Sequence, residues 1–116
     1  MQYLLMLYVD EGLWPEIGFE EKQQRFFAAY SPYIEAVQKA GILKGSNRLR
    51  LSTDATTVRV TDGKTQVLDG PYADSKEQLG GYFLIDVPDL DAALSWAARC
   101  PAAAHGTVEV RPIWSM

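Results

Sequence analysis

The sequence predicts an α+β domain in which one antiparallel sheet carries two helices on one of its faces. Strand-like and helix-like segments follow one another as strand, helix, strand, hairpin, strand, helix and strand. The chain has 116 residues, which corresponds to one domain covering residues 1–116. Its 47% hydrophobic and 22% charged content is typical of a globular protein with a single core.

The first strand is expected at residues 2–9, which are almost all apolar and end at two acidic residues. Such a short apolar run is typical of a strand that is buried on both faces in the centre of a sheet. Residues 10–18 contain glycine and proline and predict a loop. Leu13 and Trp14 are apolar residues within this loop, and either fold back onto the core or cover a pocket or a partner.

Residues 19–40 predict a long amphipathic helix, because aromatic and aliphatic side chains recur at spacings of three, four and seven. Pro32 interrupts this pattern, since proline has no N–H to donate and its ring clashes with the carbonyl four residues earlier. The helix should therefore kink at Pro32 or restart there with Ser31 as its N-cap. Gly41 is expected to end it.

The middle of the chain predicts a strand and then a hairpin. Residues 42–51 are a strand candidate, because leucine and arginine alternate near their end. Residues 56–61 and 65–68 are two short β-rich runs. Between them, Asp62 and Gly63 favour a type I′ turn, which requires the positive φ that glycine adopts easily.

The last third predicts a strand, a helix and a final strand. Residues 79–87 form an apolar strand whose two glycines leave room for another backbone or a ligand. Residues 89–99 are helical and are stopped by Pro101. A loop of small residues then leads to the strand at 107–113.

This order of elements fits a ferredoxin-like domain with both helices on one sheet face. The opposite face would be a large exposed apolar patch, so we expect a homodimer that packs sheet against sheet.

Charge and cysteine content limit the kinds of binding partner and the cellular compartment that we expect for this protein. The net charge of −4 argues against nucleic acid, because a duplex binder needs a basic stripe. No signal peptide is visible, and no apolar run is long enough for a membrane span. The single cysteine, Cys100, excludes an intrachain disulfide and fits a cytoplasmic protein. Nothing is expected to lower the pKa of its thiol, and no metal or cofactor motif is present.

Residues 69–113 read DGPYADSKEQLGGYFLIDVPDLDAALSWAARCPAAAHGTVEVRPI and closely resemble the DGPF-domain family of YCII-related proteins. The first strand, the long helix and the ATTVRV strand also fit. The resemblance implies the dimeric α+β barrel type of ferredoxin-like fold, in a homodimer with a central cleft. The family is bacterial and mostly uncharacterised, and its members are often encoded beside extracytoplasmic-function sigma factors, which hints at regulation.

This sequence departs from the family pattern at two positions that affect the chemistry of the expected site. Tyr72 replaces the phenylalanine of the family name. In YCII-type relatives, a histidine on the first helix pairs with the aspartate of the DGP turn as the proposed catalytic dyad. The first helix of this chain has no histidine, and Tyr30 lies near the expected place. A tyrosine with an ordinary pKa near 10 is a poor base at neutral pH.

The candidate site residues each have two interpretations. Asp69 either accepts hydrogen bonds within its own turn or lies at the rim of a pocket as a catalytic group. His105 is the only histidine, and is either a solvated loop residue or a general base. Lys76 either is solvated or holds an anionic ligand. With Tyr30 and Tyr72 as further ligand-binding candidates, we expect a small-molecule pocket between sheet and helices.

Whether this protein is an enzyme stays open at the level of sequence. Cofactor-free acid–base chemistry, such as that of a lyase or an isomerase, is compatible with the candidate groups. The alternative is a non-catalytic regulatory or protein-interaction protein linked to sigma-factor systems.

Overall fold

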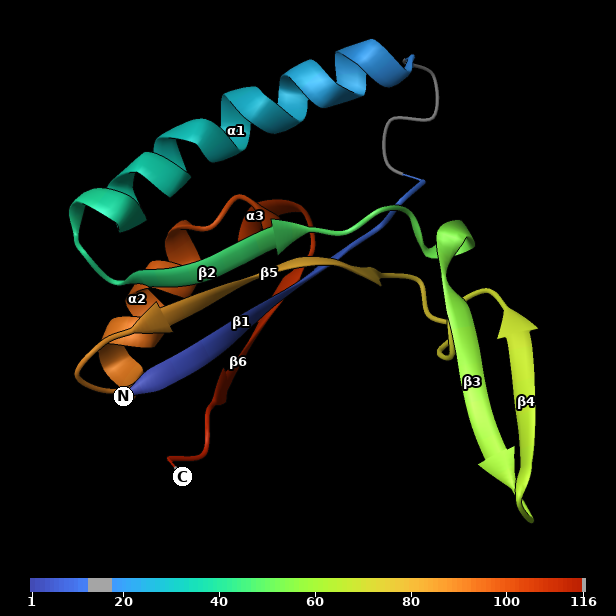
Figure 1. Cartoon of the computed structure of the whole chain (residues 1–116). Helices are drawn as coiled ribbons and strands as arrows, with labels where there is room; N and C mark the ends of the chain where they lie inside the picture. Colours follow the sequence, from blue (N-terminus) through green and yellow to red (C-terminus); the bar gives the residue numbers. More distant parts are fainter. Residues whose placement is uncertain (13–17, 116) are drawn as a thin grey trace.

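The computed structural model describes residues 1–12 and 18–115, so the expectations for Leu13 and Trp14 lie outside the described residues. Its main element is a four-stranded sheet in the order β2-β5-β1-β6 (Figure 1). The strands are β1 (Gln2–Val9), β2 (Leu43–Arg48), β5 (Gln78–Asp86) and β6 (Thr107–Pro112). All neighbouring strands are antiparallel, and β1 lies between β5 and β6. The predicted ferredoxin-like α+β fold is confirmed, with an open sheet whose edges are β2 and β6.

The helices are α1 (Phe19–Lys39), α2 (Leu90–Arg99) and the short α3 (Ala102–His105). One cluster of buried side chains joins them to the sheet. It includes Val37 of α1 and Ala93 of α2 together with Leu5 and Ile85 of the central strands. The helices therefore cover a single face of the sheet, as the sequence predicts (Figure 1).

No helix of the described residues covers the opposite face of the sheet. Along β1, Tyr3, Leu5 and Leu7 are buried under the helices, whereas Leu4 and Met6 on the other face are partly exposed. The central position of this strand was predicted correctly. Its burial on both faces was not, because only one face has a covering layer in the single chain.

Pro32 does not divide α1, and the predicted restart at Ser31 is wrong. Pro32 and Ala28 are both exposed, so the carbonyl that Pro32 cannot satisfy is open to water. Gly41 follows the helix with a φ of 72° and donates its N–H to the carbonyl oxygen of Gln38 at 3.0 Å. The predicted glycine terminator is thus confirmed.

A separate hairpin is formed by β3 (Thr56–Thr61) and β4 (Lys64–Asp69), and it extends away from the four-stranded sheet (Figure 1). Asp62 and Gly63 have φ values of 53° and 75°, as a type I′ turn requires. A 3-10 turn (Ser52–Asp54) precedes it. The strand predicted at 42–51 accordingly ends early, at Arg48.

Two glycine positions are explained by close backbone neighbours. A Cβ atom on Gly81 would lie 2.8 Å from the carbonyl oxygen of Asn47, so the neighbour that needs this space is β2. A Cβ atom on Gly106 would lie 2.1 Å from the carbonyl oxygen of Tyr8. Gly106 follows α3, which replaces the predicted loop of small residues.

Asp89 caps α2, since its carboxylate accepts a hydrogen bond from the backbone N–H of Ala92 at 2.9 Å. Among the described residues, no helix has the length and apolar character needed to cross a membrane.

Candidate functional site

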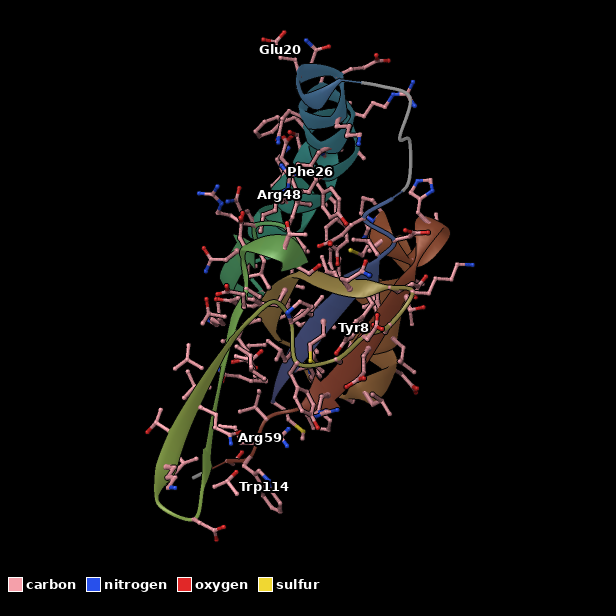
Figure 2. The ribbon with its side chains drawn as sticks, turned by 90° about the vertical axis from the view of Figure 1, so that its right-hand side faces the viewer. Tyr8, Glu20, Phe26, Arg48, Arg59 and Trp114 are labelled. Atoms are coloured by element: carbon pink, nitrogen blue, oxygen red, sulfur yellow. The ribbon has the colours of Figure 1, made fainter. Side chains whose placement is uncertain are left out.

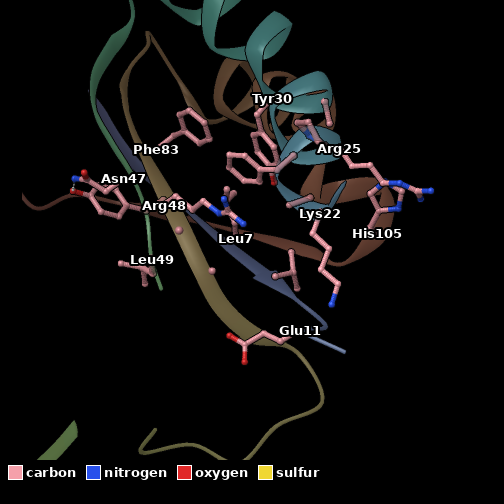
Figure 3. Close-up of a pocket in the computed structure, with 18 of the residues that line it drawn as sticks. Leu7, Glu11, Lys22, Arg25, Tyr30, Asn47, Arg48, Leu49, Phe83 and His105 are labelled. Carbon is pink, nitrogen blue, oxygen red and sulfur yellow. Dashed lines mark hydrogen bonds between the residues drawn. The ribbon is translucent and has the colours of Figure 1, made fainter. Parts of the chain in front are cut away.

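A cavity of about 230 Å³ lies between the first half of α1, the helix-covered face of the sheet, and α3 (Figure 3). Most of its wall is apolar. Side chains from β1, α1, β5 and the segment after β2 contribute to that wall: Leu7, Phe26, Tyr30, Ile34, Leu49 and Phe83. Polar side chains enter it from α1, β2 and α3.

The cavity exists because α1 packs closely on the sheet only along its second half. Tyr33 and Val37 are buried there, whereas Phe26 and Tyr30, which come earlier in the helix, are partly exposed. Phe26 and Tyr30 are four residues apart and stack with ring centroids 4.5 Å apart. Tyr30 in turn lies parallel to Phe83 of β5, with centroids 6.5 Å apart. This aromatic row forms one wall of the cavity.

Arg48, the last residue of β2, reaches α1 across the mouth of the cavity (Figures 2 and 3). Its guanidinium carbon lies 3.9 Å from the centroid of the Phe26 ring, within cation–π distance. The same guanidinium donates a hydrogen bond to the side-chain oxygen of Gln23. Arg48 is therefore held in a defined position by two residues of α1.

Tyr30, which lines the cavity, lies beside the buried Cys100. Burial raises the pKa of the Tyr30 phenol well above its ordinary value, and the nearby Cys100 thiol raises it further. Tyr30 therefore stays protonated near neutral pH and is a proton donor in hydrogen bonds, not a base. Burial also raises the pKa of the Cys100 thiol, which agrees with the absence of nucleophilic character expected from the sequence.

His105 ends α3, is exposed and contributes to the lining of the same cavity (Figure 3). The structure thus brings two of the candidate residues, Tyr30 and His105, to one site. No sequence pattern links them, since they are 75 positions apart and are joined only through the packing of α1 and α3 beside β1.

The structure places Asp69 and Tyr72 elsewhere, at the base of the hairpin. Neither is among the residues that line the cavity. The Asp69 carboxylate is exposed and makes no hydrogen bond within the described part of the chain. Its turn is closed instead by Gly70, whose N–H donates to the Ala55 carbonyl oxygen at 2.7 Å. The Tyr72 side chain is 78% exposed.

Lys76 lines a second, shallower depression along β6, which it shares with Tyr8, Glu77 and Glu109. The sequence predicts that all the candidate site residues lie around one pocket, and in the single chain they do not. The hairpin that carries Asp69 projects from the sheet, and Lys76 lies at the separate depression along β6.

The sequence interpretation missed Lys22, Arg25 and Arg48 as cavity residues. A usable signal existed, because Lys22 and Arg25 lie four and one positions before Phe26 and so flank the apolar stripe of the helix. No group of three or more histidine, cysteine or acidic residues suited to a metal is found among the described residues.

These features define a class of protein: a ferredoxin-like α+β domain with a cavity between its first helix and its sheet. The model of the YCII-related domain matches residues 1–116, and the chain belongs to that family. It is also similar to an uncharacterized protein of Rhizobium meliloti (strain 1021), with 38% identity over 118 residues that cover 97% of this chain and 92% of the relative.

Proposed function

We propose that this YCII-related protein binds a small molecule in the cavity between α1 and the sheet. The observation that carries the proposal is the cavity itself, which is apolar along most of its wall and receives a few convergent polar groups from separate elements. This combination is typical of sites for small organic ligands. Tyr30, Arg48 and His105 would make the polar contacts.

If the bound molecule also reacts, the chemistry would be cofactor-free proton transfer. Histidine is the side chain that serves most often as a general base near neutral pH, so His105 is the preferred base at the cavity. Tyr30 would donate a hydrogen bond to a substrate oxygen. Asp69 and Tyr72 could take part only in an assembly that carries the hairpin to a cavity, and Lys76 only for a ligand that extends along β6.

A thermal-shift screen of metabolites, uncharged and of both charge signs, tests the proposed site. The variant Ala29→Phe adds a ring at a residue that lines the cavity, whereas Ala98→Phe adds the same ring at an exposed residue of α2. A ligand of the cavity should raise the Tm of wild type and of Ala98→Phe, and not that of Ala29→Phe.

Asp69→Ala in the same screen addresses the hairpin. Equal shifts in wild type and Asp69→Ala would place the ligand away from Asp69. Stabilisation of Ala29→Phe to the same degree as wild type, or no stabilisation of wild type by any compound, would refute binding in the cavity.

We further propose a homodimer that forms through the open sheet face. Leu4 and Met6 of β1 lie on this face opposite Leu84 and Tyr82 of β5, and all four side chains are only partly buried. Light scattering should give twice the chain mass for wild type, and Met6→Lys should shift the protein to the monomer. A wild-type protein that is monomeric at micromolar concentrations would contradict this assembly.

The second candidate function is that of a non-catalytic regulatory or interaction protein, for which a sigma factor is the proposed kind of partner. The exposed apolar side chains of the hairpin favour it, because Val58, Val60, Val67 and Leu68 are 61% to 64% exposed. Co-purification with a sigma factor that is lost on Val58→Lys would support it, and recovery of the chain alone would count against it. A cytoplasmic location is proposed on the basis of the single free, buried cysteine.

A further inference from the structure

We infer that the ligand of the cavity is a small carboxylate with an apolar body about the size of one ring, whose charge is held by Arg48 and Lys22. This inference rests on the proposed function, since it names the chemical class of molecule that the same cavity accepts. Charge balance, the arrangement of Arg48, and the size of the apolar wall support it independently.

Cationic side chains gather at the cavity although the protein is acidic overall. The chain has a net charge of −4, yet among the described residues three permanently cationic side chains line the cavity beside two carboxylates, and one of the three cations, Arg25, is paired with Glu21 of α1 at 3.2 Å. The cationic residues are Lys22, Arg25 and Arg48, and the acidic ones are Asp10 and Glu11.

Both carboxylates are already engaged by donors other than these cations. Glu11 accepts hydrogen bonds from the backbone N–H of Ser52 at 2.8 Å and from its hydroxyl at 2.5 Å. Asp10 accepts one from the backbone N–H of Gly12 at 2.8 Å. Within the described part of the chain, neither Lys22 nor Arg48 has an acidic partner at ion-pair distance. An anionic ligand would therefore meet cationic groups that internal ion pairs do not neutralise.

The arrangement of Arg48 suits a carboxylate in particular. A guanidinium has five N–H donors in a planar fork, and only one direction of this fork is used by Gln23. The Phe26 ring supports the group from one side, at 3.9 Å. A fork held in this way can donate two parallel hydrogen bonds to a carboxylate. Lys22 lies one helical turn before Phe26 and lines the same cavity, so its ammonium group is the second cationic contact that we propose for the ligand.

The volume of the cavity limits the size of the apolar part of the ligand. An apolar cavity of about 150 Å³ accommodates benzene. The cavity here has about 230 Å³, which leaves room for one ring and a short substituent. The Phe26, Tyr30 and Phe83 rings supply faces against which such a body can pack.

NMR titration of the full-length protein with matched acids and amides tests this inference. The probes are benzoate, phenylacetate and cyclohexanecarboxylate, each paired with its neutral amide at pH 7, where the acids are ionised. Each acid should bind at least about 10-fold more tightly than its amide, because a hydrogen bond to a charged group is worth more than one to a neutral group. Perturbed amide resonances should include those of Arg48 and Phe83, and binding should weaken as salt is added.

Variants separate the charge contacts from the cavity itself. Arg48→Gln and Lys22→Gln should each remove most of the preference for the acid over the amide, while Arg48→Lys should retain part of it. Arg59→Gln is the matched control, because Arg59 lies on the hairpin beside Tyr72 and outside the lining. The Lys22 variant keeps the test valid if the loss of the Arg48–Phe26 contact disturbs α1.

The outcomes distinguish this inference from the proposed function. If the amides bind in the cavity as tightly as the acids, the inference that the ligand is a carboxylate is wrong, while the proposal that the cavity binds a small molecule still stands. Acids that bind equally well to wild type, Arg48→Gln and Lys22→Gln would also overturn it. Absence of binding by both series, together with a negative metabolite screen, would refute the proposed function as well.

Discussion

The Tyr33 phenol donates a hydrogen bond to the backbone carbonyl oxygen of Trp96 at 2.9 Å, and this bond connects α1 to α2 inside an otherwise apolar core. The two rings meet edge to face, with centroids 6.4 Å apart. Tyr33 also meets Phe83 of β5 edge to face at 5.2 Å. One side chain thus fixes both helices and the sheet relative to one another, on the side of α1 away from the open end of the cavity.

Tyr33→Phe should lower the free energy of unfolding by about 1 kcal/mol, because it leaves the Trp96 carbonyl without this donor while the ring contacts stay. Urea denaturation followed by circular dichroism measures the change. Tyr72→Phe serves as the control, since the exposed Tyr72 hydroxyl makes no hydrogen bond within the described residues. Equal effects of the two substitutions would show that the Tyr33 hydroxyl contributes nothing specific.

Alkaline conditions should destabilise the protein through Tyr30 and Tyr33. Burial is the main cause that raises the pKa of both phenols above the ordinary value near 10. The unfolded chain therefore loses these protons first, so stability is fully present below pH 10 and falls as the pH rises above it. The slope is at most about 1.4 kcal/mol per pH unit for each tyrosine.

Absorbance at 295 nm during a pH titration should show a late phase of tyrosine ionisation that becomes smaller in Tyr30→Phe. Tyr30→Phe should have a shallower decline of stability between pH 10 and 11 than wild type. A decline of the same slope in wild type and in this variant would contradict the assignment to Tyr30.

Gly106→Ala should be strongly destabilising, by more than about 2 kcal/mol. The added Cβ atom would come within 2.1 Å of the Tyr8 carbonyl oxygen, so the junction of α3 with β6 would have to move away from β1. Gly18→Ala is the matched control, because a Cβ atom there meets no other atom within 4 Å. Thermal unfolding of the two variants checks the difference, and similar Tm values would contradict it.

Cys100 should resist thiol reagents in the folded protein. Its side chain is 2% exposed, and burial raises the pKa of its thiol, so the reactive thiolate is scarce. Modification by iodoacetamide at pH 8 should be at least about 100-fold slower without denaturant than in 6 M guanidinium, if it proceeds through rare opening. Comparable rates in the two conditions would show that the thiol is accessible in the native state.

The sequence predicts the order of elements well, because each depends on local signals. Apolar runs with turn residues locate the strands, and Asp62-Gly63 identifies the hairpin turn. The end of β2 was missed because it depends on where the chain leaves β5, which is a tertiary contact. α3 was missed because a helix of three alanines and one histidine is too short to have a periodic pattern of its own.

The site was less predictable than the fold. Tyr30 and His105 were named from the sequence and do share a cavity. Arg48 was not named, because its role depends on the crossing of β2 and α1, which brings it onto Phe26 from 22 positions away. Asp69 was named for its family motif, and motif membership carries no information about distance from a cavity.

The projecting hairpin has a consequence for how this sequence can be altered. β3 and β4 form a sheet of their own, almost every residue of which is exposed, and none of their side chains lines the cavity. Residues 56–69 can therefore be exchanged for a short linker without removing any strand of the four-stranded unit. Such a shortened chain would be a minimal scaffold in which ligand binding is engineered apart from the contacts that the hairpin makes with other molecules.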